Sequence, residues 1–310
     1  MPDPRLALRD VDRLRRIVGR RLLRWVNARA FREDFLARVP PELRSACSWV
    51  FAQDYRGEER ALARRIESHR QRIPALAQSG QCRSMSSPMP GTFELDDRGH
   101  SAGAPLTLRP AKAHAATGVE PRGGILLRRL VDDMALDSVL ELGTNTGMSA
   151  SYILSARRAP HLTTVEGSPD LCAIAEHVQK EHSGNYRIIN DLFDRAIDTL
   201  TAEGQKFDAV FIDGQHEEQA TIHYAERVER LLAPGGVLIF DDIYWSHGML
   251  AAWKHIVLQE RFRITVDLSW QGLALIGSGI ERRLRDAPAR KVHFDVCDYV
   301  GRTGVAYRDR

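Results

Sequence analysis

The chain has little that suggests a secreted, disulfide-bonded or membrane-spanning protein. Its 310 residues include only four cysteines, which are far apart and show no C-x-x-C pair and no histidine partner at zinc-finger spacing. No apolar run approaches the roughly 20 residues of a transmembrane helix, and the N-terminus lacks the apolar segment of a secretory signal. We therefore expect free thiols, no membrane span and a cytoplasmic protein.

Lysine is absent from the first 75 residues, which hold 18 arginines and 10 acidic residues. The whole chain has a formal net charge of +3, so the remainder is acidic. A basic segment beside an acidic body suits docking of the two parts, binding of a nucleic acid, or contact with an anionic membrane surface. Docking, or a simple solvated face, is the plainest interpretation.

Hydrophobic spacing divides the chain into four segments. An amphipathic helix is predicted over residues 5–38 and a second helical stretch over 42–73, with prolines after each. Residues 78–118 are rich in Ser, Gly, Pro and Ala without a sustained period. The predicted organisation is an arginine-rich helical extension (1–77), a linker or loop-rich segment (78–118), the main domain (119–280) and a C-terminal tail (281–310).

Strands and helices alternate from residue 119 onward. This alternation predicts an α/β fold with a doubly wound, mostly parallel sheet and helices on both faces. The connection between the last two strands is too short for a helical crossover, so they should form an antiparallel C-terminal hairpin. The seven predicted strands are 138–142, 162–166, 186–189, 207–212, 236–241, 262–267 and 271–276.

The most informative segment is E-L-G-T-N-T-G-M-S at residues 141–149. Gly143 permits backbone angles that other residues avoid, and Gly147 leaves room for a ligand at a helix N-terminus, whose N–H groups hold anionic groups. The spacing E-x-G-x-x-x-G departs from the G-x-G-x-x-G of dinucleotide sites. The turn indicates a nucleotide-like cofactor, and a purely structural turn is the alternative.

Acidic residues stand at the ends of the strands that follow. Glu166 ends the second strand about 20 residues after the turn, where a carboxylate can accept hydrogen bonds from both hydroxyls of a ribose. Asp191, Asp213 and Asp241 follow the next three strands. Ligands of open α/β sheets bind at this edge. The structural alternatives are a helix-opening acid for Glu166 and a helix N-cap for Asp191.

These segments together resemble the class I methyltransferases that use S-adenosyl-L-methionine (SAM). The glycine turn is similar to their first motif. F-I-D-G-x-H at 211–216, P-G-G at 234–236 and a strand ending in D-D at 241–242 resemble the O-methyltransferase-like families related to the catechol and caffeoyl-coenzyme A enzymes. The D-G-x-H and D-D-I-x-W-S variants resemble a bacterial subgroup. The resemblance covers residues 117–277 and does not extend to 1–80.

The resemblance implies SAM as the cofactor. Glu166 would bind its ribose, Asp191 would face the adenine amino group, and Ser149 would touch the carboxylate of the methionine part. The predicted cofactor-binding residues are Glu141, Gly143, Thr144, Gly147, Ser149, Glu166, Asp191 and Asp213.

The resemblance also implies a divalent cation, because Asp213, Asp241 and Asp242 match positions that bind Mg²⁺ in the catechol-type enzymes. Carboxylate oxygens suit Mg²⁺. The third position is an asparagine in those enzymes, so Asp242 leaves the metal open. It also admits a metal-free alternative, in which one aspartate binds SAM or orients a substrate donor.

The catalytic lysine of the catechol-type enzymes is matched here by His216. A histidine titrates near neutral pH and can accept a proton from a hydroxyl, so His216 is the predicted base, with Asp213 beside it in the catalytic set. A capping histidine is the structural alternative, and His247 is a second candidate base. Tyr244 and Trp245 are candidate pocket walls, whereas Trp253 is expected in the core.

The predicted reaction is O-methylation of a small-molecule hydroxyl, in which the protein aligns the acceptor with an already activated methyl group and removes a proton. One alternative is methylation of a macromolecule such as RNA through the basic N-terminal helices. The chain has no N-P-P-Y-type motif for methylation of base amines, which counts modestly against this alternative. Another is a non-catalytic SAM-fold interaction module. A homodimer through the N-terminal helices is a further expectation.

Overall fold

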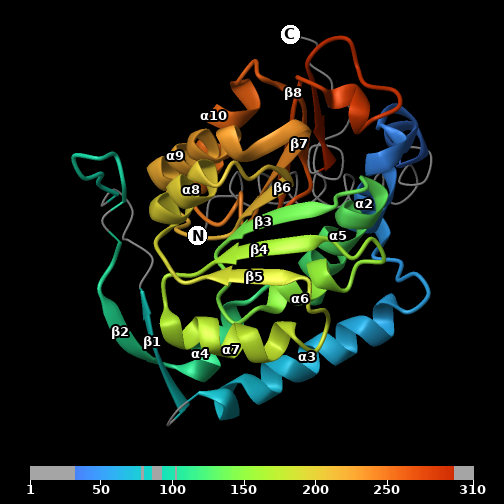
Figure 1. The fold of residues 1–310 in the computed structure, drawn as a ribbon. Helices are drawn as coiled ribbons and strands as arrows, with labels where there is room; N and C mark the ends of the chain where they lie inside the picture. Colours follow the sequence, from blue (N-terminus) through green and yellow to red (C-terminus); the bar gives the residue numbers. More distant parts are fainter. Residues whose placement is uncertain (1–31, 78–79, 86–92, 102, 297–310) are drawn as a thin grey trace, which may run out of the picture.

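The structure is a computed structural model that describes residues 32–77, 80–85, 93–101 and 103–296. Most of the helix predicted over 5–38, and Cys297, lie outside the described residues, although residues 32–38 are helical. An eight-stranded sheet forms the centre and carries helices on both faces (Figure 1). The predicted α/β, doubly wound class is confirmed.

The strands of this sheet lie in the order β10-β8-β9-β7-β6-β3-β4-β5. Among them, β9 runs antiparallel to both β7 and β8, which confirms the C-terminal hairpin. The strand β10 comes from the predicted tail and pairs parallel with β8, so the sheet has one strand more than the seven predicted. The bounds are β3 Ser138–Leu142, β4 His161–Val165, β5 Tyr186–Ile189, β6 Phe207–Ile212, β7 Leu232–Phe240, β8 Phe262–Asp267, β9 Gly272–Ile276 and β10 Val292–Asp295.

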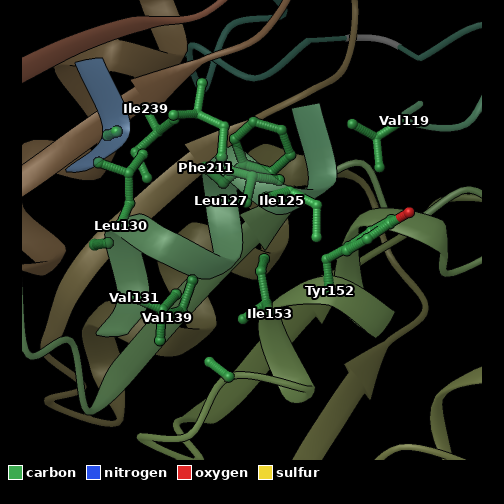
Figure 2. Packing of buried hydrophobic residues seen from close by; sticks show 14 of the residues in the cluster. Val119, Ile125, Leu127, Leu130, Val131, Val139, Tyr152, Ile153, Phe211 and Ile239 are labelled. Carbon is green, nitrogen blue, oxygen red and sulfur yellow. The ribbon is translucent and has the colours of Figure 1, made fainter. Parts of the chain in front are cut away.

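Alternate residues of the strands bury opposite faces of the sheet. Val139 belongs to a hydrophobic core that also holds buried residues of α2, α3, α5, α6 and α7, whereas its neighbour Leu140 belongs to a second core with residues of α8, α9 and α10. Figure 2 shows the first of these cores, where Leu127 of α5 lies near Phe211. The helix bounds are α2 Pro41–Ala52, α3 Glu59–Leu76, α4 Ala111–Thr117, α5 Pro121–Asp133, α6 Met148–Leu154, α7 Pro169–Gln179, α8 Phe193–Ala202, α9 Glu218–Val228 and α10 His247–Leu258. None of the described helices is both long and apolar enough to cross a membrane.

The N-terminal helices α2 and α3 dock on the domain that carries the sheet. Arg129 of α5 forms a buried bidentate ion pair with Glu59, with N–O distances of 2.9 and 2.7 Å. The buried Trp49 donates its indole N–H to the carbonyl oxygen of Arg122 at 2.8 Å. On the other side, Arg72 pairs with Glu181 at 2.7 Å. Glu59 and Arg72 are therefore charged residues of the described extension that serve docking.

Residues 80–118 contain regular structure where the composition indicated a linker or loops. The strands β1 (Gln81–Met85) and β2 (Leu106–Pro110) pair antiparallel, and α4 follows directly. The β1–β2 ribbon stands on the side toward which the arrows of β3, β4 and β5 point (Figure 1). This segment therefore lies at the carboxyl edge of the sheet.

The direction of winding reverses between β3 and β6. From β3 the chain adds β4 and β5 on one side, and it then returns to place β6 and β7 on the other. Ligands of open α/β sheets bind at such a switch point, outside the carboxyl ends of the strands. The glycine turn after β3 and Asp213 after β6 meet there.

Candidate active site

The glycine turn after β3 is held in a form that requires its two glycines. Gly143 has φ +110°, and a β-carbon there would lie 2.1 Å from the carbonyl oxygen of Asp213. Gly147 has φ +81°, and its β-carbon would lie 3.2 Å from Cα of Ala175. The turn is thus pressed against β6 and α7, as expected for a cradle at the switch point.

Glu141 supports this turn from below. Its carboxylate is fully buried and accepts hydrogen bonds from the hydroxyls of Ser149 and Thr164, each at 2.5 Å. Burial raises the pKa of Glu141 to about 8, while the two hydroxyls lower it and the charges of Asp213 and Glu166 raise it further. The Ser149 hydroxyl therefore points into the protein, and its contact with a cofactor carboxylate stays a prediction.

Glu166 lies at the carboxyl end of β4 with a fixed orientation. One carboxylate oxygen accepts the backbone N–H of Asn145, and the other accepts that of Ser168, both at 2.9 Å. Burial raises the pKa of Glu166, and these N–H donors oppose the rise. Each oxygen keeps a second lone pair for another donor, as a ribose would require.

The remaining predicted cofactor residues lie around the same edge. Thr144 is buried with its hydroxyl 2.5 Å from that of Thr164, so it anchors the turn to β4. Asp191 accepts the backbone N–H of Leu192 at 2.8 Å. Because Leu192 is the N-cap of α8, the capping alternative for Asp191 does not hold.

The second half of the site is an acidic cluster around His216. The Nε2 atom of His216 lies 3.4 Å from Oδ1 of Asp213 and 3.9 Å from Oδ2 of Asp242. Asp241 is buried beside them and has a carboxylate oxygen without a hydrogen-bond partner among the described residues. The structure therefore brings together all four residues predicted for catalysis or metal binding.

The charges of this cluster shift one another's pKa values. Burial lowers the pKa of His216, but the contact with Asp213 and the charges of Asp213, Asp242 and Asp241 outweigh it and raise the pKa to about 9. Burial raises the pKa of Asp213, against the effect of His216. Burial, with the charges of Asp213 and Asp242, raises the pKa of Asp241 well above its ordinary range. The imidazolium is thus the cation that the carboxylates surround at neutral pH.

The donor set as placed does not fit a resident divalent cation. Across the described ranges, no group of three His, Cys, Asp or Glu side chains is arranged to hold a metal ion. The ring of His216 stands within 4 Å of two of the three predicted ligands, and its Nε2 atom is buried. A divalent cation stays a prediction from the resemblance.

Aromatic residues divide between the core and the rim. Trp253 is buried and its indole N–H approaches Asp267 at 3.3 Å, so its expected place in the core is confirmed. Tyr244 donates its hydroxyl to the same carboxylate at 2.6 Å and remains half exposed. Trp245 is 72% exposed, and His247 begins α10 in an exposed position.

Asn145 and Thr164 belong to the site, although the sequence analysis assigned neither of them a role. Asn145 has φ +47°, donates its backbone N–H to Glu166 and its side-chain amide to the Thr117 hydroxyl at 3.2 Å. Thr164 holds both Glu141 and Thr144. The positive φ of Asn145 could have been anticipated, because asparagine tolerates the left-handed region. The role of Thr164 depends on register between strands.

Known proteins resemble this chain over its central part. Residues 140–243 match the family of methyltransferase domains. A protein of Mycolicibacterium vanbaalenii named "Putative O-methyltransferase" is 33% identical over 129 residues, which is 40% of this chain and 55% of the relative. One from Mycobacterium sp. (strain JLS), with the same name, is 32% identical over 126 residues, 40% of this chain and 56% of the relative. The chain thus spans about half the length of these curated relatives.

Solved structures also resemble about half of the chain. An O-methyltransferase from Bacillus cereus in complex with SAH, the demethylated product of SAM, is 21% identical, with a TM-score of 0.45, over 53% of this chain and 87% of the other. The O-methyltransferase TomG from Streptomyces achromogenes, in complex with SAM, is 21% identical, with a TM-score of 0.45, over 51% of this chain and 81% of the other.

The resemblance to the O-methyltransferase-like members of the class I methyltransferases, predicted from the glycine turn and the strand ends, is therefore confirmed over the central part of the chain.

Proposed function

We propose that the protein transfers a methyl group from SAM to the hydroxyl of a small molecule. The observation that carries the proposal is the meeting of two half-sites at the switch point. The glycine turn and Glu166 form the first half-site, and Asp213 and His216 form the second. The two half-sites meet where the main chain of Gly143 packs against that of Asp213. A cofactor held on the first would present its reactive end to the second.

The residues of the first half-site fit SAM. The oriented carboxylate of Glu166 suits a ribose diol, and Asn145 has a buried side-chain oxygen without a hydrogen-bond partner among the described residues. Asp191 lies one strand further along the same edge, where an adenine amino group would follow the ribose. When bound, SAM supplies an electrophilic methyl group on its sulfonium sulfur.

His216 and Asp213 supply the proton transfer. The charge of Asp213, 3.4 Å from Nε2 of His216, favours a proton on that nitrogen, which leaves Nδ1 as the basic nitrogen of the neutral ring. Nδ1 accepts the hydroxyl proton of the acceptor while its oxygen takes the methyl group, and Asp213 stabilises the resulting imidazolium. Because the pKa of His216 is about 9, about one molecule in a hundred has a neutral ring at pH 7. Turnover should therefore rise toward alkaline pH.

We propose no step through a divalent cation, because His216 stands among the predicted ligands. The test is methyl transfer to a panel of phenols after EDTA treatment, with and without added Mg²⁺. Unchanged SAH formation is expected. Loss of activity with EDTA and recovery with Mg²⁺ would show that the cation belongs to the reaction.

The macromolecular alternative depends on arginines that have other partners here. Arg70 donates to the carbonyl oxygens of Gly118 at 3.2 Å and Val119 at 2.7 Å, and Arg72 pairs with Glu181. We therefore favour docking as the role of the described extension. We keep the proposed division of the chain into four segments, with boundaries after residues 77, 118 and 280. Salt-sensitive RNA binding by the full chain would favour the alternative.

Calorimetry with SAH tests the proposal. We expect binding to the full chain and a loss of about tenfold or more in Glu166→Gln, since hydrogen bonds to a charged acceptor are removed. Glu203→Gln is the matched control, because Glu203 is exposed and pairs with Arg187 at 2.6 Å. A chain that binds no SAH, or binds it without turnover of any hydroxyl acceptor, would instead favour a non-catalytic module. The free thiols of Cys47, Cys82 and Cys172 support the proposed cytoplasmic location.

A further inference from the structure

The strand β1, which lies outside the matched methyltransferase domain, is fastened to the loop after Glu166. The hydroxyl of Ser168 donates to the carbonyl oxygen of Arg83. The backbone N–H of Arg83 donates to Asp170 at 2.8 Å, and its guanidinium group pairs with the same carboxylate at 2.9 Å. These contacts fix β1 beside the start of α7, one turn from the proposed ribose-binding carboxylate.

The last residue of β1, Met85, occupies the space above Gly167. A β-carbon on Gly167 would lie 2.5 Å from the terminal methyl carbon of Met85 and 3.1 Å from its sulfur. Gly167 directly follows Glu166 and offers no side chain of its own. Met85 is only partly buried.

Ser101 and Gly103, from the same segment 80–118, lie against the loop after β5 and the start of α8. A β-carbon on Gly103 would lie 2.9 Å from a methyl carbon of Leu192, the residue after Asp191. The backbone N–H of Ser101 donates to the buried carboxylate of Asp194 at 2.7 Å. Residues of the segment 80–118 therefore flank both loops, the one after β4 and the one after β5.

We propose that Met85 forms a wall of the nucleoside subsite and packs its thioether against the adenine ring. This inference rests on the proposed function. A ribose bound at Glu166 with the adenine amino group at Asp191 places the base between the loops after β4 and β5, beside Met85. Because residue 167 is glycine, the end of the Met85 side chain fills the position that a side chain at 167 would take, and thioethers make favourable contacts with aromatic rings. The subsite is thus completed by a segment outside the matched domain.

Nuclear magnetic resonance of the full chain labelled with ¹³C-methyl methionine gives a direct readout. The chain has only six methionines, so the Met85 signal can be assigned by its absence in Met85→Leu. On addition of SAH, and also of adenosine, we expect the Met85 methyl signal to move upfield, because the adenine ring current acts on atoms above its face.

Calorimetry supplies the matching energetic test. Met85→Ala should weaken both SAH and adenosine by about three- to tenfold, the range expected for one sulfur–aromatic contact. The attachments of Arg83 to Ser168 and Asp170 do not involve the Met85 side chain, so β1 should stay docked and the melting temperature should change little. Leu108→Ala is the control, because Leu108 lies on the paired strand β2 and is 68% exposed.

The outcomes separate this inference from the proposed function. If wild-type protein binds SAH but the Met85 signal does not move, Met85 does not touch the base and the inference is wrong, while the proposed function stands. Equal affinity of wild type and Met85→Ala has the same meaning. If wild-type protein binds no SAH, the proposed function fails and the inference fails with it.

Discussion

The pKa of His216 offers a test of the acidic cluster that needs no knowledge of the acceptor. The change is Asp213→Asn, which keeps the size of the side chain and removes its charge. In the wild type the pKa of His216 is raised from 6.5 to about 9. That difference corresponds to about 3.4 kcal/mol in favour of the imidazolium, at about 1.36 kcal/mol per pH unit.

The distances explain this magnitude. Unit charges 3.4 Å apart attract by about 5 kcal/mol at an effective dielectric constant of about 20, and burial of the ring opposes protonation. Asp242, at 3.9 Å, adds to the attraction. Without the Asp213 charge, burial should regain influence, and the pKa of His216 should fall from about 9 toward or below 6.5.

The assay is a pH titration of the imidazole proton signals by nuclear magnetic resonance, with His216 assigned through His216→Asn. A wild-type midpoint at or below 6.5, or a midpoint that Asp213→Asn leaves unchanged, would refute the reasoning. Because the ring is protonated in the fold between 6.5 and about 9, its contribution to stability should be lost as pH rises through that range.

Three further predictions concern stability, each measured by urea unfolding. Gly143→Ala should lower the free energy of unfolding by about 2 kcal/mol more than Gly204→Ala does. Both glycines have positive φ, but only at Gly143 would the added β-carbon meet backbone, at 2.1 Å. Equal losses in the two variants would contradict this. The Glu141 carboxyl keeps its proton in the fold up to about pH 8, so stability should fall by about 1.4 kcal/mol per pH unit as pH rises from 4.5 toward 8. Glu141→Gln should make the measured slope shallower by this amount, while the raised pKa values of Glu166, Asp213 and Asp241 keep the rest of it, and an unchanged slope would show that Glu141 is ionised in the fold. Arg129→Ala should lower the free energy of unfolding by about 3–5 kcal/mol, because it removes the bidentate partner of the buried Glu59 and leaves Arg128, at 3.6 Å, as its nearest cation. Arg158→Ala, in an exposed pair, should cost about 1 kcal/mol or less; similar losses in both variants would contradict the docking role.

The sheet could be predicted closely because its strands are apolar runs that end in glycine or aspartate. The bounds of β3, β5, β6 and β8 match the prediction residue for residue. The strand β10 was missed because it is four residues long and lies among charged residues. The strands β1 and β2 were missed because a composition rich in Ser, Gly and Pro hides short strands that are defined by pairing with each other.

The candidate site could be predicted as a set of residues, but not as a set of contacts. Strand ends alone bring Gly143, Glu166 and Asp213 to one edge of a parallel sheet. The hydrogen bond from Ser149 to Glu141 depends on which way the first turn of α6 faces. The raised pKa of His216 depends on carboxylates that follow two different strands and outweigh the effect of burial, and a linear spacing reveals neither influence.

The most direct test of the proposed cofactor site is a crystal structure of the full chain grown with SAH. We predict SAH across the ends of β3 and β4, with both ribose hydroxyls within hydrogen-bond distance of the Glu166 carboxylate and the sulfur facing Asp213 and His216. An empty crevice at millimolar SAH, or SAH bound elsewhere while Glu166 holds only the N–H groups of Asn145 and Ser168, would contradict it.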